Sequence, residues 1–116
     1  MIQMQRYYQK EIECASREQI RQWQSERLVK TVAHAYKDNE YYRSIMDKHG
    51  VKPEDIKSVD DLHKLPFIDK SNLREAYPYG LLCVPKSDVV RIQSTSGTTG
   101  KRVIAYYTQK DLDMWD

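Results

Sequence analysis

The chain has 116 residues, of which 40% are hydrophobic and 31% charged, and its mean hydropathy is −0.81. This length suits one domain or part of a larger one, and nine tyrosines and two tryptophans argue against a disordered chain. A net charge of +2, without a block of like charge, gives no support to nucleic-acid or membrane-surface binding.

The composition also predicts a cytoplasmic protein. The first residues lack the apolar core of a signal peptide, and no apolar run is long enough to span a bilayer. The two cysteines, Cys14 and Cys83, lie far apart and form no CxxC pair or Cys/His cluster, as expected for reduced thiols in the cytosol.

The strongest periodic pattern predicts a long amphipathic helix over residues 17–37. Ser16 and Gln19 fit a capping box, which satisfies the free backbone N–H groups at a helix start. Apolar and near-apolar side chains then recur at roughly helical spacing: Ile20, Trp23, Leu28, Thr31, Val32, Ala35 and Tyr36. These side chains are expected to form the packed face of the helix.

Shorter helical segments are predicted between residues 39 and 76. Asn39 can cap a second helix that runs through His49, and Gly50 stands where a left-handed helix terminator belongs. Further turns are expected to begin at Pro53, at Ser58 (59–64) and at Asp69 (70–76), and Tyr77 to Gly80 is expected to form a turn or loop. The acidic pairs Glu54-Asp55 and Asp60-Asp61 are interpreted as helix-start charges and not as catalytic pairs.

The pattern changes after Gly80. Residues 89–94 and 103–108 are rich in β-branched and aromatic residues and predict two strands, and a helical pattern begins at Gln109. A sheet of two strands is not independently stable, so we infer that the chain is the front of a longer protein. The predicted fold is α+β, with a helical segment over 1–80 and the start of a second, strand-containing domain over 81–116.

The stretch between the two predicted strands carries the clearest chemical signal. It reads Ser94, Thr95, Ser96, Gly97, Thr98, Thr99, Gly100 and Lys101, followed by Arg102. Glycines let a backbone approach a ligand closely, converging N–H groups and hydroxyls donate to anions, and lysine adds a mobile positive charge. Such a loop suits a polyphosphate.

This loop is not a Walker A motif, which has four residues between its glycines, Ser or Thr after the lysine, and a following helix. Here two residues separate Gly97 from Gly100, and a strand follows. A flexible Ser/Thr/Gly hairpin is the ordinary alternative, but the order Thr-Ser-Gly-Thr-Thr-Gly-Lys between two strands favours phosphate binding.

The loop resembles the phosphate loop of the acyl-adenylate-forming superfamily of acyl-CoA synthetases. Its flanks look like the N-terminal region of phenylacetate–CoA ligases: His34-Ala35-Tyr36, Tyr41-Tyr42-Arg43, Leu65-Pro66-Phe67, Lys70 to Arg74, Tyr77 to Gly80 and Val89 to Ile92. The resemblance covers nearly all of the chain from about Trp23. It departs from many members in having Arg102 where they have proline.

The resemblance implies a helical N-terminal segment that leads into the first strands of a large α/β adenylate-forming (AMP-binding) domain. It implies that a carboxylate, such as an aryl acid, attacks the α-phosphate of ATP, giving an acyl-adenylate and pyrophosphate. Coenzyme A then displaces AMP to form a thioester, and magnesium accompanies the ATP. Carried over, Ser94 to Gly100 form the loop and Lys101 is its cation. The catalytic residues are expected beyond residue 116, so the chain alone is predicted to be inactive.

Alternatives to an enzyme stay open. The chain could be a non-catalytic helical interaction module, or a remnant that complements the rest of a ligase in trans. A nucleic-acid-binding role would need a basic face, which the balanced charges of residues 17–37 do not supply. A different acid could also be activated. Exposed strand edges predict a homodimer or low stability in isolation.

The remaining candidate residues favour ordinary structural roles. His34, His49 and His63 are not spaced as metal ligands. The aromatic residues Trp23, Tyr36, Tyr41, Tyr42, Tyr77 and Tyr79 are expected to pack. Arg91, beside the loop, is expected to face solvent in preference to binding phosphate.

Overall fold

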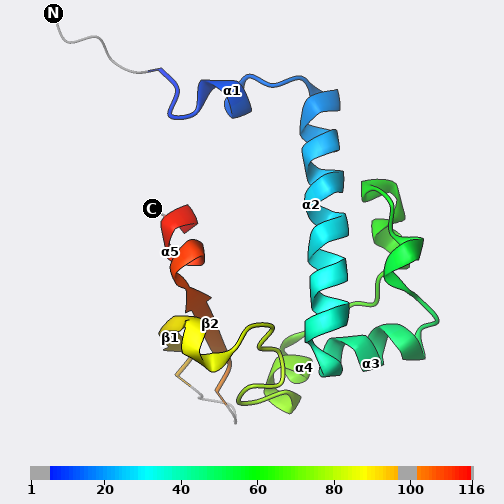
Figure 1. The fold of residues 1–116 in the computed structure, drawn as a ribbon, viewed down its shortest axis with the longest axis vertical. Helices are drawn as coiled ribbons and strands as arrows, with labels where there is room; N and C mark the ends of the chain where they lie inside the picture. Colours follow the sequence, from blue (N-terminus) through cyan, green and yellow to red (C-terminus); the bar gives the residue numbers. More distant parts are fainter. Residues whose placement is uncertain (1–5, 97–101, 116) are drawn as a thin grey trace, which may run out of the picture.

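The computed structural model describes residues 6–96 and 102–115. Its α-helices are α1 (Lys10–Glu13), α2 (Arg17–Asp38), α3 (Glu40–Lys48), α4 (Lys70–Glu75) and α5 (Gln109–Trp115), and its strands are β1 (Val89–Ser94) and β2 (Ile104–Thr108). Short 3-10 helices are η1 (Pro53–Asp55), η2 (Val59–Lys64) and η3 (Lys86–Asp88). The helical segment and the β1–β2 hairpin form two side-by-side parts joined by irregular chain (Figure 1).

Helix α2 is the central element of the helical part, and α3 crosses its end (Figure 1). Ser16 caps α2 as predicted, its Oγ accepting a hydrogen bond from the Gln19 backbone N–H at 3.1 Å. Asn39 ends α2 and begins α3, and its Oδ1 accepts from the Tyr42 N–H at 2.7 Å. Gly50 has φ +72°, the left-handed conformation predicted for it.

The hydrophobic core lies between α2, α3 and the segment that follows them. Its buried members are Val32, Met46, Val51 and Ile56, and Leu28, Tyr36, Tyr42 and Leu65 pack against these. This cluster confirms packing for two of the predicted aromatic residues. The core is small, and among the described residues after Gly80 none is buried.

The predicted starts of the later turns are also confirmed. Pro53 opens η1, the Ser58 side chain accepts from the Asp60 N–H ahead of η2, and the Asp69 side chain accepts from the Ser71 and Asn72 N–H groups ahead of α4. Segments 53–55 and 59–64 are 3-10 helices. The acidic residues predicted at these starts lie in the first turns of η1 and η2.

One difference from the sequence patterns concerns a short segment. The patterns did not predict α1, a single turn with no buried residue, held by a bond from the Gln9 N–H to Glu13 Oε2. The side chains of the short apolar run 81–84 are half-buried in irregular chain. The predicted combination of helices followed by strands is confirmed.

No helix within residues 6–96 and 102–115 combines the length and the apolar character needed to cross a membrane.

Candidate functional site

The β1–β2 hairpin brings the two ends of the predicted phosphate loop together. The strands pair antiparallel, with Ser94 opposite Ile104 and Ile92 opposite Tyr106. One residue further, the Thr95 N–H donates to the Val103 carbonyl at 3.0 Å, and Thr95 Oγ1 accepts from the Val103 N–H at 3.1 Å. Thr95 thus closes the base of the loop with both its backbone and its hydroxyl.

The structure describes part of the predicted loop. Ser94 ends β1, Thr95 pairs with Val103, and Ser96 is exposed at the start of the connection. Gly97, Thr98, Thr99, Gly100 and Lys101 lie outside the described residues. The hairpin base therefore supports the strand–loop–strand arrangement predicted from sequence, and phosphate binding by the loop stays a prediction.

Two arginines lie on the hairpin, Arg102 directly beside this base and Arg91 four residues before Thr95, opposite Tyr107. Arg91 on β1 and Arg102 before β2 are both exposed. Exposure of Arg91 agrees with the expectation that it faces solvent. The position of Arg102 gives the end of the loop a second cation beside the predicted lysine.

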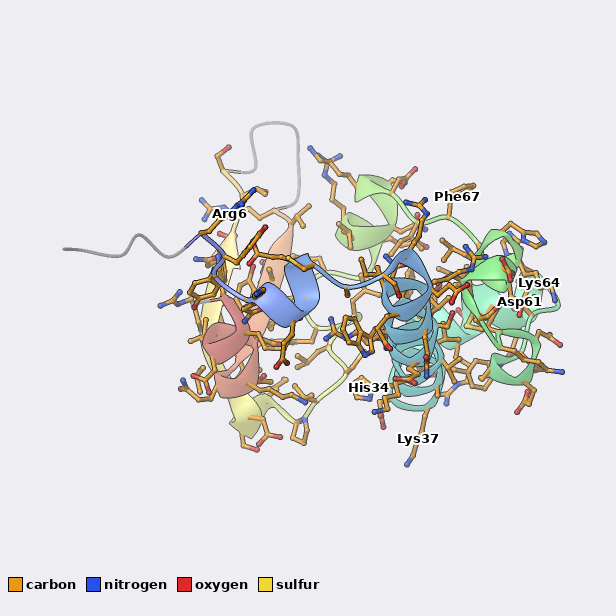
Figure 2. All side chains as sticks on the ribbon, turned by 90° about the horizontal axis from the view of Figure 1, so that it is seen from above. Arg6, His34, Lys37, Asp61, Lys64 and Phe67 are labelled. Carbon is orange, nitrogen blue, oxygen red and sulfur yellow. The ribbon has the colours of Figure 1, made fainter. Side chains whose placement is uncertain are left out.

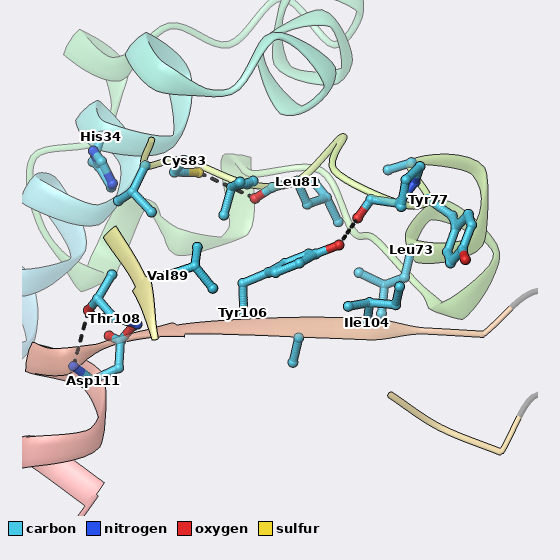
Figure 3. Close-up of a pocket in the computed structure, with 15 residues that line it drawn as sticks. His34, Leu73, Tyr77, Leu81, Cys83, Val89, Ile104, Tyr106, Thr108 and Asp111 are labelled. Carbon is cyan, nitrogen blue, oxygen red and sulfur yellow. Dashed lines mark hydrogen bonds between the residues drawn. The ribbon is translucent and has the colours of Figure 1, made fainter. Parts of the chain in front are cut away.

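A cavity of about 500 Å³ separates the hairpin from the helical part (Figure 3). Its walls come from the hairpin strands, the first turn of α5, α4 and the turn after it, and the irregular chain leading to β1: Leu73, Ala76, Tyr77, Pro78, Leu81, Leu82, Cys83, Val84, Val89, Ile104, Ala105, Tyr106, Thr108 and Asp111, together with His34 of α2. Most of these side chains are apolar.

Tyr106 crosses this cavity from β2 to the turn at residues 77–80 (Figure 3). Its hydroxyl donates to the Pro78 carbonyl at 2.5 Å. Its ring lies 5.5 Å from the Tyr79 ring, between centroids, and Lys86 Nζ lies 3.9 Å from the Tyr79 ring centroid. Tyr77 and Tyr79 are more than two-fifths exposed, so their predicted packing is partial.

Burial shifts the titration of two groups near the cavity. It raises the pKa of the Tyr106 phenol, and the neighbouring Tyr79 and Tyr77 add to the rise. The phenol therefore keeps its proton at neutral pH and can donate to Pro78. Burial likewise raises the pKa of the Cys83 thiol, which donates to the Leu81 carbonyl at 3.5 Å.

The turn at 77–80 is also held from the helical part. The buried side chain of Asn39 donates through Nδ2 to the Gly80 carbonyl at 2.8 Å. Tyr41 of α3 donates to Glu75 at 3.0 Å and accepts from Asn72 at 3.2 Å, which fixes α4. Sequence patterns marked Asn39 only as a helix cap and Tyr106 only as a strand residue.

The histidines and the remaining cysteine have local surroundings. His34 Nδ1 lies 2.7 Å from Asp38, His49 Nδ1 lies 2.9 Å from the Ile45 carbonyl, and His63 Nδ1 lies 2.9 Å from the Asp60 carbonyl. Figure 2 shows His34 beside Lys37, away from Asp61 and Lys64. Cys14 is a free, exposed cysteine. In the part of the chain that the structure describes, no group of three His, Cys, Asp or Glu side chains is arranged to hold a metal ion.

Comparisons with known proteins support the resemblance read from the motifs. The chain is 47% identical over 104 residues to a phenylacetate–coenzyme A ligase of Aromatoleum evansii, and 42% identical over 108 residues to that of Thermus thermophilus. These matches cover 90% and 93% of this chain and 24% of each relative. The chain thus spans about a quarter of the length of the curated relatives it matches. No protein-family model matches it.

Solved structures agree on the fold. A 2-hydroxyisobutyryl-CoA ligase in complex with 2-HIB-AMP and CoA matches 92% of this chain with a TM-score of 0.83 at 27% identity, and the match covers 24% of that protein. A second structure of this ligase, in an open conformation, also gives a TM-score of 0.83, at 25% identity. The predicted resemblance to phenylacetate–CoA ligases is confirmed in sequence, and the predicted fold class is confirmed by these neighbours.

Proposed function

We propose that this chain is the front section of an ATP-dependent, AMP-forming acid–CoA ligase, in which residues 94–101 hold the β- and γ-phosphates of ATP. The observation that carries the proposal is the strand–loop–strand base closed by Thr95 and Val103, in a chain with phenylacetate–CoA ligase relatives. We further propose that residues 81–116 begin the AMP-binding domain and that residues 1–80 form the helical segment before it.

The reaction of the whole protein would follow two steps. The carboxylate oxygen of the acid attacks the α-phosphorus of ATP, and pyrophosphate leaves. The thiolate of coenzyme A then attacks the acyl carbon, and AMP leaves with the carboxylate oxygen. An aryl acid such as phenylacetate is the proposed substrate, because phenylacetate–CoA ligases are the relatives named above.

The residues of this chain would stabilise the leaving group, pyrophosphate. Negative charge grows on pyrophosphate as the bond to the α-phosphorus breaks, and donors fixed before the reaction stabilise that charge without reorganising. The hairpin base supplies this fixation, and Lys101, with Arg102 beside it, supplies the positive charge. Magnesium would enter with ATP, and no residue of this chain is assigned to it.

The test is ATP–pyrophosphate exchange by the complete ligase that contains this chain, with phenylacetate as the acid. Lys101→Ala should lower exchange about 100-fold, the scale seen when one preorganised transition-state donor is removed. Lys110→Ala, outside the loop, is the matched control and should leave the rate unchanged. The proposal would be contradicted if ATP–pyrophosphate exchange did not depend on an added acid, or if Lys101→Ala exchanged at the wild-type rate. Purified residues 1–116 should form no thioester.

A further inference from the structure

Asn39 is the buried polar side chain among the described residues, with 2% of its surface exposed. A buried amide is costly unless its donors and acceptors are satisfied. Here the carbonyl oxygen caps α3 by accepting from the Tyr42 N–H at 2.7 Å, and the amide nitrogen donates to the Gly80 carbonyl at 2.8 Å. The same side chain therefore begins a helix and fixes a turn 41 residues further along the chain.

The two bonds make different demands on the residue type. Ser, Thr and Asp cap helices about as well as Asn, because each offers a short side-chain oxygen. Asp has no donor when ionised, and Ser and Thr have a single hydroxyl oxygen that would have to serve as both donor and acceptor, whereas Asn carries a separate N–H donor beside its acceptor. The cap alone does not require asparagine at position 39, but the cap and the bond to Gly80 together do.

The turn that receives this bond is tightly built. The Gly80 N–H donates to the Ala76 carbonyl at 2.6 Å. A Cβ atom at Gly80 would run into that carbonyl oxygen and come within 2.8 Å of Ala76 Cβ. Only glycine allows this approach, which leaves the Gly80 carbonyl facing Asn39.

The far side of the same turn is bonded to the hairpin. Tyr106, opposite Ile92 in the sheet, donates to the Pro78 carbonyl at 2.5 Å and contacts the Tyr79 ring. A line of contacts therefore runs from Asn39 through residues 78–80 to Tyr106, whose hydrogen bond to this turn is drawn in Figure 3, and then along β2 to the Thr95–Val103 base. Each step is a specific hydrogen bond or a covalent connection.

We propose that Asn39 is a positioning residue for the phosphate-binding hairpin, acting through the turn at 77–80 and Tyr106. This inference rests on the proposed function. The α2–α3 junction, next to the hydrophobic core, serves as the fixed reference, and the hairpin, in which none of residues 89–96 and 102–108 is buried, takes its orientation from it. Misplacement of a positioned group by about 1 Å can lower a rate about 100-fold, so loss of this anchor affects ATP use.

The experiment measures KM for ATP and for the acid, by ATP–pyrophosphate exchange, in the complete ligase. Asn39→Asp and Asn39→Ser keep the helix cap and remove the amide N–H that donates to the Gly80 carbonyl. Tyr106→Phe keeps the ring contact and removes the donor to Pro78. Each should raise KM for ATP about tenfold, the scale for loss of a single buried hydrogen bond, and leave KM for the acid unchanged.

The matched control is Ser16→Ala, which removes a helix cap far from the hairpin and so lowers stability without breaking this line. It should leave KM for ATP unchanged. The double variant Asn39→Ser with Tyr106→Phe should be no worse than the worse single variant, because both changes break the same line. Additive effects, or Asn39 variants that behave like Ser16→Ala, would overturn the proposal.

Failure of the proposed function gives a different result, namely a wild-type protein that shows no acid-dependent ATP–pyrophosphate exchange. Amide hydrogen exchange then tests, independently of activity, whether Asn39 anchors the hairpin. Faster exchange in residues 89–95 and 103–108 in Asn39→Ser, but not in Ser16→Ala, supports the anchor. Equal exchange in the two variants rejects it.

Discussion

At the scale of single residues, three polar side chains join α2, α3 and η1 at the surface. Lys52 Nζ donates to Asp47 Oδ1 at 2.7 Å and to the Tyr36 hydroxyl at 3.0 Å, and Tyr36 donates to Asp47 at 2.8 Å. The hydrogen bond from Lys52 is the first cause that lowers the pKa of Asp47, and the bond to Asp47 is the first that raises the pKa of Lys52. Both groups are therefore better stabilised in charged form in the folded state.

The sign of the linkage follows from these directions. A carboxyl whose pKa falls on folding adds stability above its unfolded pKa of about 3.9, and that stability is lost as pH falls through the folded value. A lysine whose pKa rises adds stability below its unfolded pKa of about 10.4, lost as pH rises through the folded value. The cluster therefore stabilises the fold between roughly pH 4 and pH 10.

We expect Asp47→Asn to lower Tm at pH 7 by a small amount, because exposed ion pairs contribute little. The difference from wild type should shrink as pH falls below about 4, where the wild-type carboxyl also gains a proton. Thermal unfolding at pH 7, 4 and 2 measures this. Lys52→Met should show the same trend at pH 7, and a deficit in Asp47→Asn that persists at pH 2 would show that the loss comes from packing.

Local capping chemistry was predictable at this scale, and long-range bonds were not. Ser16, Asn39, Ser58 and Asp69 carry side-chain oxygens at helix starts, and each caps as expected because the acceptor and the N–H lie two or three residues apart. The bond from Asn39 to Gly80 depends on how distant segments meet, and a single sequence contains no spacing that reports it.

At the scale of elements, the end of α3 shows how one glycine and the core act together. The Gly50 N–H donates to the Asp47 carbonyl and the Val51 N–H donates to the Met46 carbonyl, both at 3.0 Å. This is the Schellman pattern, in which the residue at the glycine position is left-handed and the residue after it contacts the last turn. Val51 and Met46 are both buried in the core cluster.

Gly50→Ala should therefore lower the free energy of unfolding by about 1 kcal/mol, because L-residues other than Asn and Asp pay that cost for the left-handed region. Apart from Gly50 and its two chain neighbours, no atom of the described residues lies within 4 Å of the position that an added Cβ would occupy, so the loss is conformational and not steric. Gly50→Asn should cost less, since Asn tolerates this conformation. Urea unfolding measures both, and equal losses would contradict a backbone origin.

The elements themselves were predictable where their periodicity is long or their strand residues are distinctive. The pattern over residues 17–37 gave α2 to within one residue, and the β-branched run gave β1 over 89–94. The sequence pattern did not predict α1, because this helix has no buried face and its apolar residues do not recur at helical spacing. The position of the cavity between β2 and segment 73–84 could not be predicted either, because it depends on tertiary packing.

At the scale of the whole molecule, the chain is more extended than a compact domain. Its radius of gyration is 17.6 Å, against about 13 Å for a compact protein of 100 residues. Large apolar side chains stay exposed on both parts, including Phe67 at 100%, Ile92 at 60% and Met114 at 72%. In Figure 2, Phe67 points away from the rest of the helical part. The homodimer suggested by the strand edges stays a prediction.

The uneven burial predicts that the two parts of the isolated chain unfold separately. All buried hydrophobic residues of the described chain lie at or before Ala76. In the hairpin part, α5 instead contacts β2 through the rings of Tyr107 and Trp115, whose centroids are 5.4 Å apart. A part without a buried core loses its structure at lower denaturant and exposes less surface, which gives a smaller dependence on urea.

The two tryptophans allow each part to be followed alone. Trp23→Phe leaves Trp115 as the reporter of the hairpin and α5, and Trp115→Phe leaves Trp23 as the reporter of α2. We expect the urea midpoint measured by fluorescence to be lower in Trp23→Phe than in Trp115→Phe. The unfolding transition measured by far-UV circular dichroism should coincide with the fluorescence transition of Trp115→Phe, because α2 and α3 contain most of the helix. Coincident midpoints would instead mean one cooperative unit. In that case the contacts of Asn39 and Tyr106 would be strong enough to couple the hairpin to the core even in the isolated chain.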